Sequence, residues 1–162
     1  MRLRSRGVAA DARSLAEVDD IAVWTAVVIG SAVYFGTWRK EASEFVRAHK
    51  DVLATRPLWL FSSGPVGRKD LSAPKEIAEF ETAPGFRGHE VFAGCLDRGA
   101  LSIGERLVIK GVKAPYGDFR DWPAIDAWAD RVGDELQGDR RDRGGDRRAV
   151  EPAPGEPVLA AV

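Results

Sequence analysis

The sequence is poor in the residues that build metal centres, disulfide frameworks and histidine-dependent active sites. Its 162 residues include one cysteine, Cys95, and two histidines, His49 and His89. A single thiol excludes an internal disulfide and a C-x-x-C metal or redox pair, and it indicates a reducing, intracellular compartment. Two histidines are too few for most metal sites and argue against a histidine-centred catalytic triad.

An excess of charge of one sign is also missing. The chain has 24 basic and 25 acidic side chains, a formal net charge of -1. Without a positive field to attract nucleic acid, a dedicated nucleic-acid binder is disfavoured. The basic start of the chain, residues 1–6, is followed by acidic residues rather than an apolar stretch, which argues against a secretion signal. We therefore expect a cytoplasmic protein.

One uncharged run, Ile21–Trp38, approaches the length of a membrane-spanning helix. Its composition points elsewhere, because β-branched residues dominate its first part and Gly30 and Gly36 interrupt it. A buried strand followed by an uncharged loop explains the run better. Hydrophobic residues make up 44% of the chain, which is enough to build the core of a soluble domain.

Apolar runs and amphipathic segments alternate along the chain. Continuous apolar runs are typical of strands covered on both faces of a parallel sheet, whereas an apolar stripe every three or four residues indicates a helix. The predicted strands are residues 24–30, 58–61 and 89–96, with a weaker one in 2–8, and the predicted helices are 39–54, 101–112 and a last one from Trp122, with shorter ones after Ser14 and at 75–80. The alternation predicts an α/β domain with a mostly parallel sheet, in which Cys95 is buried in a strand.

The end of the chain differs in composition from the rest. Residues 137–148 contain no apolar residue, and three prolines occur within residues 151–162. Such a segment buries too little apolar surface to offset the entropy lost on ordering. The sequence therefore predicts a domain over residues 1–136 and a disordered tail over residues 137–162.

Two loops are expected at the edge where ligands bind in parallel α/β sheets, at the carboxyl ends of the strands. They are residues 31–38, after the first long strand, and residues 62–67, after the second. Both are uncharged and consist largely of glycine, serine, aliphatic and aromatic residues. Such loops suit a flat, aromatic, largely apolar ligand that is held by backbone amides.

The run Val-Val-Ile-Gly-Ser-Ala-Val-Tyr-Phe-Gly, residues 27–36, resembles the third strand and following loop of flavodoxin-like proteins. Further similarity lies in residues 60–65, in Val91–Gly94 and in Asp121-Trp122, at the start of the last helix. The branch that the chain most resembles is menaquinone-dependent protoporphyrinogen oxidase and the flavodoxin-domain proteins related to it. The resemblance spans residues 1–136 and rests on the ordered set of four motifs.

The resemblance implies a flavodoxin-like three-layer sandwich that binds FMN at the strand ends. Tyr34 or Phe35, together with Trp38, would flank the flavin ring, although the same aromatic side chains would also fit a role in packing against the following helix. Gly36 beside flavin N5 would allow a peptide flip when the flavin takes up a proton. The second loop would cover the other side of the ring, or else be a plain strand-to-helix turn. The implied cofactor-binding residues are Ser31, Ala32, Val33, Tyr34, Phe35, Gly36, Ser62, Ser63 and Gly64.

The chain departs from the family pattern at its N-terminus. Flavodoxin-like chains open with a strand and a Ser/Thr/Gly-rich loop that grips the FMN phosphate. Here the sequence begins at what resembles the second strand, so the first strand, the phosphate loop and the first helix are missing. In the strand order 2-1-3-4-5 this leaves the apolar strand at residues 27–29 with an unpaired edge. We expect a truncated sequence with weakened FMN affinity; a decayed gene, or residues 2–8 pairing beside residues 24–29, are the alternatives.

These observations lead to two hypotheses of different kinds. The first is an FMN-dependent redox protein that transfers electrons or oxidises a reduced substrate such as protoporphyrinogen, in haem biosynthesis, with a quinone or a partner protein as acceptor. The second is a truncated interaction module that binds no flavin and has no enzymatic activity. A third, weaker hypothesis is peripheral membrane contact through residues 101–113, where Arg106, Lys110 and Lys113 give a basic amphipathic pattern.

Overall fold

The computed structural model describes residues 2–64, 72–97, 99, 115–144 and 157–161, without the side chains of 140–144. The expected helix at 101–112, with its basic pattern, and residues 65–67 of the second loop lie outside the described residues.

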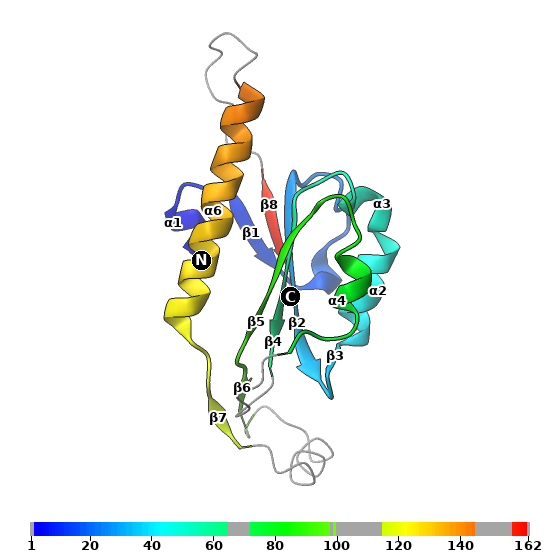
Figure 1. Cartoon of the computed structure of the whole chain (residues 1–162), viewed down its shortest axis with the longest axis vertical. Coiled ribbons are helices and arrows are strands. Elements are labelled where there is room, and N and C mark those ends of the chain that lie inside the picture. The colour runs from blue at the N-terminus through cyan, green and yellow to red at the C-terminus, as the bar shows by residue number, and fades with distance from the viewer. Residues whose placement is uncertain (1, 65–71, 98, 100–114, 145–156, 162) are drawn as a thin grey trace.

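A parallel sheet forms the centre of the molecule (Figure 1). Its strands have the order β1-β8-β2-β4-β5, and a short antiparallel strand, β3, extends from β2. Their bounds are β1 Ala10–Arg13, β8 Val158–Ala161, β2 Ala26–Tyr34, β4 Leu58–Ser63, β5 Phe86–Phe92 and β3 Thr37–Trp38. A separate antiparallel pair is formed by β6, Cys95–Leu96, and β7, Gly117–Asp118.

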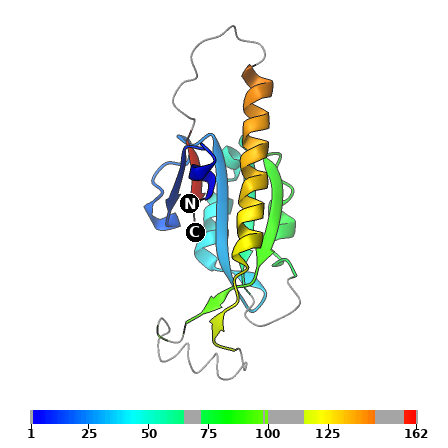
Figure 2. The same ribbon diagram turned by 90° about the vertical axis from the view of Figure 1, so that its left-hand side faces the viewer.

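Helices cover both faces of this sheet, which confirms the three-layer α/β sandwich (Figures 1 and 2). One face carries α2, Lys40–Ala48, α3, Lys50–Leu53, α4, Ile77–Phe80, and the short 3-10 turn η1, Leu15–Glu17. The other face carries α1, Arg2–Ser5, and the long helix α6, Trp122–Gly144.

The apolar strands alternate between two cores. Val27 and Ile29 of β2 are 0% exposed and pack with Leu53 on the α2 face, whereas Val28 packs with Val132 on the α6 face. Because each strand buries both sets of side chains, its sequence is continuously apolar. This explains why the runs at 24–30 and 58–61 could be recognised as strands, and why 39–54, covered on one side only, showed a helical stripe.

Strand β8 fills the place that the sequence was expected to leave empty. It lies between β1 and β2 and pairs in parallel with both, Val158 opposite Ala10 and Ala26. Its backbone is anchored at the entry, where Val158 N donates to Ala9 O at 2.8 Å and Thr25 N donates to Pro157 O at 3.0 Å. The predicted unpaired edge on β2 is therefore wrong: a segment from the far end of the sequence occupies the position of the first strand in the order 2-1-3-4-5.

The predicted disordered tail is wrong for the parts of residues 137–162 that the structure describes. Helix α6 continues to Gly144, and residues 158–161 belong to the same sheet as the rest of the domain. Val158, Leu159 and Ala161 are 0% exposed. A short apolar run after Pro157 is enough to form a strand when both neighbours are in place, and the average composition of the tail concealed it.

Two further expectations are corrected. Residues 2–5 form the helix α1 instead of a strand, and the strand on that side starts at Ala10. Strand β2 runs to Tyr34, so residues 31–34 of the first expected loop are strand rather than loop. The reason is β3, which folds back on β2 and gives residues 33 and 34 a hydrogen-bonded partner.

Candidate functional site

A strained two-residue turn joins β2 to β3. Tyr34 pairs with Thr37, so Phe35 and Gly36 are the two turn residues, and their φ angles are 51° and 77°. Positive φ at both positions is the geometry of a type I′ turn, which favours asparagine or aspartate followed by glycine. Gly36 suits it, but a bulky Phe35 in this conformation is an outlier that costs about 1–3 kcal/mol. The side chain of Phe35 is also 77% exposed, so packing does not explain its presence.

The second predicted segment lies beside the first at the same edge. In the parallel register Ser31 pairs with Ser62 and Ala32 with Ser63, and Gly64 comes next with a φ of 117°. The structure thus brings the nine predicted site residues together at the carboxyl ends of β2 and β4, which is where ligands bind in such sheets.

A glycine that the sequence analysis left out of the site lies at the same edge. A Cβ built on Gly94, after β5, would approach the Cα and N of Gly64 to 3.2 Å. The two strand ends therefore meet backbone to backbone, and Gly64 N donates to Phe92 O at 2.9 Å. The signal was present in the motif Val91–Gly94, which contributed to the resemblance but not to the predicted site residues.

The hydroxyl groups of the two register-paired serines point into the protein. Ser31 Oγ accepts a hydrogen bond from Arg39 N at 3.1 Å and donates to Ala32 O at 3.0 Å. Ser62 Oγ accepts from Trp38 Nε1 at 2.7 Å and lies 2.8 Å from His89 Nε2. Both serines are buried. Their hydroxyl groups are therefore engaged with the protein rather than directed at a ligand.

Trp38 takes the packing role that the sequence left open as the alternative to flanking a flavin ring. Trp38 is 4% exposed and packs against Phe80, with ring centroids 5.7 Å apart, so it belongs to the core and not to a surface for stacking. His89 is half-buried, and its imidazole contacts the hydroxyl of Ser62. Burial lowers the pKa of the His89 imidazole to about 4, so the ring is neutral at neutral pH.

Strands β3, β6 and β7 lie at the same end of the molecule (Figure 1), and exposed aromatic side chains belong to the β2–β3 hairpin and to the segment around β7. They are Tyr34 and Phe35 on the hairpin and Tyr116, Phe119 and Trp122 around β7. Cys95, expected to be buried, is exposed in β6, because this short strand pairs outside the main sheet.

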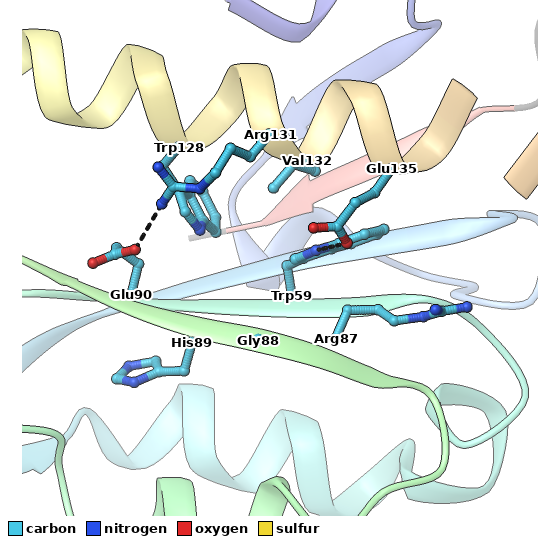
Figure 3. Close-up of a pocket in the computed structure, with 9 residues that line it drawn as sticks. All are labelled: Trp59, Arg87, Gly88, His89, Glu90, Trp128, Arg131, Val132 and Glu135. Carbon is cyan, nitrogen blue, oxygen red and sulfur yellow. Dashed lines mark hydrogen bonds and ion pairs between the residues drawn. The ribbon is translucent and has the colours of Figure 1, made fainter. Parts of the chain in front are cut away.

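Away from this edge, a hollow of about 170 Å³ lies between β5 and α6 (Figure 3). Its charged side chains pair with neighbours in the hollow: Arg131 with Glu90 at 3.0 Å, and Glu135 with the Trp59 indole N–H at 3.2 Å. Figure 3 shows the His89 ring on the side of β5 that faces away from Trp128 and Arg131. Because these charges are already paired, the hollow offers less for a ligand than the strand edge does.

Comparison with protein-family models gives a match to the flavodoxin domain over residues 1–121. The chain belongs to the flavodoxin domain family. Domains of this family generally bind flavin and take part in redox reactions. Searches of curated proteins and of solved structures returned no match. The matched range ends before α6, so β8, which fills the position of the first flavodoxin strand, lies outside it.

The described residues fit the ring of a flavin. An added Cβ on Gly36 would have no atom within 4 Å, so there is open space beside the hairpin turn, and the Gly64–Gly94 contact keeps the adjoining strand ends free of side chains. In the described part of the chain, no helix is both long and apolar enough to cross a bilayer.

Proposed function

We propose that this flavodoxin-family protein binds FMN and transfers electrons, holding the flavin ring at the carboxyl edge of β2 and β4. The observation that carries the proposal is Phe35, a strained and 77% exposed aromatic residue at the tip of the hairpin beside this edge. Strain of this kind persists where function requires it. A flat aromatic ligand gives the exposed ring a partner.

The residues divide the work of holding the ring. Phe35 and Tyr34 flank it, and the backbone groups of residues 34–36 bond its edge. Gly64 and Gly94 let the ring approach the strand ends, since no side chain stands between it and the backbone. FMN, when bound, supplies the electron chemistry, while the protein sets its orientation, burial and potential.

The substrate and the acceptor are the finer part of the proposal. We propose oxidation of a reduced, flat aromatic substrate such as protoporphyrinogen, with a quinone or a partner protein as acceptor. The resemblance of residues 27–36 to the protoporphyrinogen oxidase branch supports this assignment. So do the exposed side chains of Tyr116, Phe119 and Trp122, because a large apolar molecule suits an aromatic surface.

The alternative is an interaction module that binds no flavin. It is favoured by the exposed aromatic side chains of Phe35, Tyr116 and Phe119, because exposed apolar patches mark sites of contact with other proteins. The same aromatic surface would then contact another protein.

A titration with FMN and with riboflavin, followed by quenching of flavin fluorescence, tests the proposal. The proposed contacts are all to the flavin ring, which riboflavin and FMN share. The dissociation constant of riboflavin should therefore lie within about tenfold of that of FMN, a smaller difference than one charge-assisted hydrogen bond to the phosphate would produce. Saturable quenching by both flavins is the expected result. No quenching by either flavin would contradict flavin binding and favour the interaction module.

A further inference from the structure

A chain of buried polar groups lies directly beneath the proposed ring site. It runs from the indole of Trp38, on β3, through the hydroxyl of Ser62, on β4, to the imidazole of His89, on β5. Ser62 is 0% exposed and Trp38 is 4% exposed. Three elements that meet at the same edge are thereby tied through a single oxygen atom.

The chemistry of the three groups fixes the direction of these hydrogen bonds. The indole N–H of Trp38 can only donate, so Ser62 Oγ accepts it. Within the residues that the structure describes, the other partner of this hydroxyl is His89 Nε2. If Nε2 carried the hydrogen and donated to Ser62 Oγ, the hydroxyl hydrogen would have no acceptor among the described residues. We therefore assign Ser62 as donor to Nε2, which requires the neutral His89 tautomer with its hydrogen on Nδ1.

We propose that His89 and Ser62 are positioning residues for the flavin ring. They hold the β2–β3 hairpin in the position in which its turn contacts the ring. This inference rests on the proposed function. His89 accepts the hydroxyl hydrogen of Ser62 and so orients the hydroxyl group. A lone pair of the Ser62 oxygen then accepts the indole N–H of Trp38. This bond connects β3, and with it the Phe35-Gly36 turn, to β4. Within the hairpin itself, the turn is closed by the pairing of Tyr34 with Thr37 and by Thr37 Oγ1, which donates to Tyr34 O at 2.9 Å. The bond from Trp38 to Ser62 adds a tie from the hairpin to β4.

The neutral state of His89 is part of this device. A charged imidazole would point a second N–H at Ser62 Oγ, and the hydroxyl hydrogen would then lose its acceptor in a buried place. A buried hydroxyl hydrogen without an acceptor lowers the stability of the protein. The contacts among Trp38, Ser62 and His89 therefore favour one His89 tautomer and one direction of the Ser62 hydroxyl.

The experiment uses the full chain and two measurements. In the flavin-free protein, long-range proton–nitrogen NMR of the imidazoles reports the tautomer, and replacing the other histidine by His49→Gln leaves His89 as the sole signal. We expect the Nδ1–H form in the parent protein and a return to Nε2–H in Ser62→Ala. An Nε2–H form in the parent protein would overturn the inference without any reference to flavin.

The second measurement is FMN affinity, by fluorescence quenching, for Ser62→Ala, Trp38→Phe, His89→Leu and His89→Gln. Loss of one link should weaken FMN binding about tenfold, the equivalent of one net hydrogen bond. His89→Gln, whose side-chain oxygen can accept from Ser62, should recover most of the affinity lost in His89→Leu. The band shape of bound FMN should shift with each weakened variant, since the hairpin no longer holds the ring in one pose.

Ser43→Ala is the matched control. Ser43 is also a buried serine, 5% exposed, but its hydroxyl points to Arg39 O at 3.4 Å, one turn back in α2, and does not reach Trp38. Its FMN affinity should stay within twofold of the parent's. If the parent binds FMN and Ser62→Ala binds it equally well with an unchanged spectrum, the positioning role is wrong while the proposed function stands. If the parent binds no FMN, both fail.

Discussion

Strand β8 and the tip of the β2–β3 hairpin are opposites in physical terms. Leu159 of β8 is 0% exposed, pairs on both sides and has ordinary backbone geometry, whereas Phe35 is 77% exposed and has a φ of 51°. The strand contributes stability, and the hairpin tip costs stability. The contrast shows where to look for function, because a strained residue that packing does not require indicates a role other than stabilising the fold.

The largest effect is expected from placing a charge in each region. Leu159→Asp buries a carboxylate between β1 and β2 without a partner, and should cost more than about 4 kcal/mol, enough to unfold a domain of this size. Phe35→Asp makes the same kind of change in an exposed turn that tolerates aspartate. Chemical denaturation of both variants measures the difference. Comparable losses would show that the two regions do not differ as described.

Relieving the backbone strain at Phe35 should change the stability of the protein and its affinity for FMN in opposite directions. Phe35→Asn keeps the turn but suits its positive φ, so the free energy of unfolding should rise by about 1 kcal/mol. The loss of the aromatic ring should at the same time weaken FMN binding about tenfold. Phe35→Tyr, which keeps both ring and strain, is the control for binding. A Phe35→Asn protein that is more stable and binds FMN as well as the parent would remove Phe35 from the site.

The backbone contact at the edge can be tested with two glycines in or just after β5. Gly94→Ala would press its Cβ against Gly64 at 3.2 Å and should destabilise by about 1–2 kcal/mol, because backbone yields little. Gly88→Ala, in β5, meets no atom within 4 Å and should stabilise by about 0.5 kcal/mol through reduced freedom of the unfolded chain. Thermal unfolding of the pair checks the sign of each change.

The last expected effect is a pH dependence of stability that arises from His89. Its pKa is lowered from 6.5 to about 4 on folding, so between these values the unfolded chain binds more protons than the folded one. The contribution is present above pH 6.5 and is lost as the pH falls toward 4, on the order of 1 kcal/mol after screening by solvent. The difference between the parent protein and His89→Gln across this range isolates it. A flat difference would mean that His89 is not buried.

The layered α/β fold was predictable because β2 and β4 are short runs buried on both faces, and α2 has one apolar stripe. The same logic located Ser31–Gly36 and Ser62–Gly64 at one edge. Strand β8 could not be found in this way, since four apolar residues carry no period and their partners, β1 and β2, are more than 120 positions away. Pairing that depends on such distant segments is a tertiary effect, which composition averages away.

Two features of the site were hidden for a related reason. Trp38 packs against Phe80 and donates to Ser62, and His89 contacts Ser62 as well. These partners are distant in the sequence, so the sequence could not decide between stacking and packing for Trp38. The strain at Phe35 was also invisible, because it arises from the pairing of Tyr34 with Thr37 and not from the turn residues themselves.

Hydrogen–deuterium exchange of the full chain, with and without saturating FMN, tests the central claim most directly. The account predicts that FMN slows exchange at the backbone amides of the hairpin turn, residues 34–36, and around Gly64 and Gly94, and leaves β8 as slow as it already is. Protection confined to the hollow between β5 and α6, or absent from the hairpin, would contradict a flavin site at this edge.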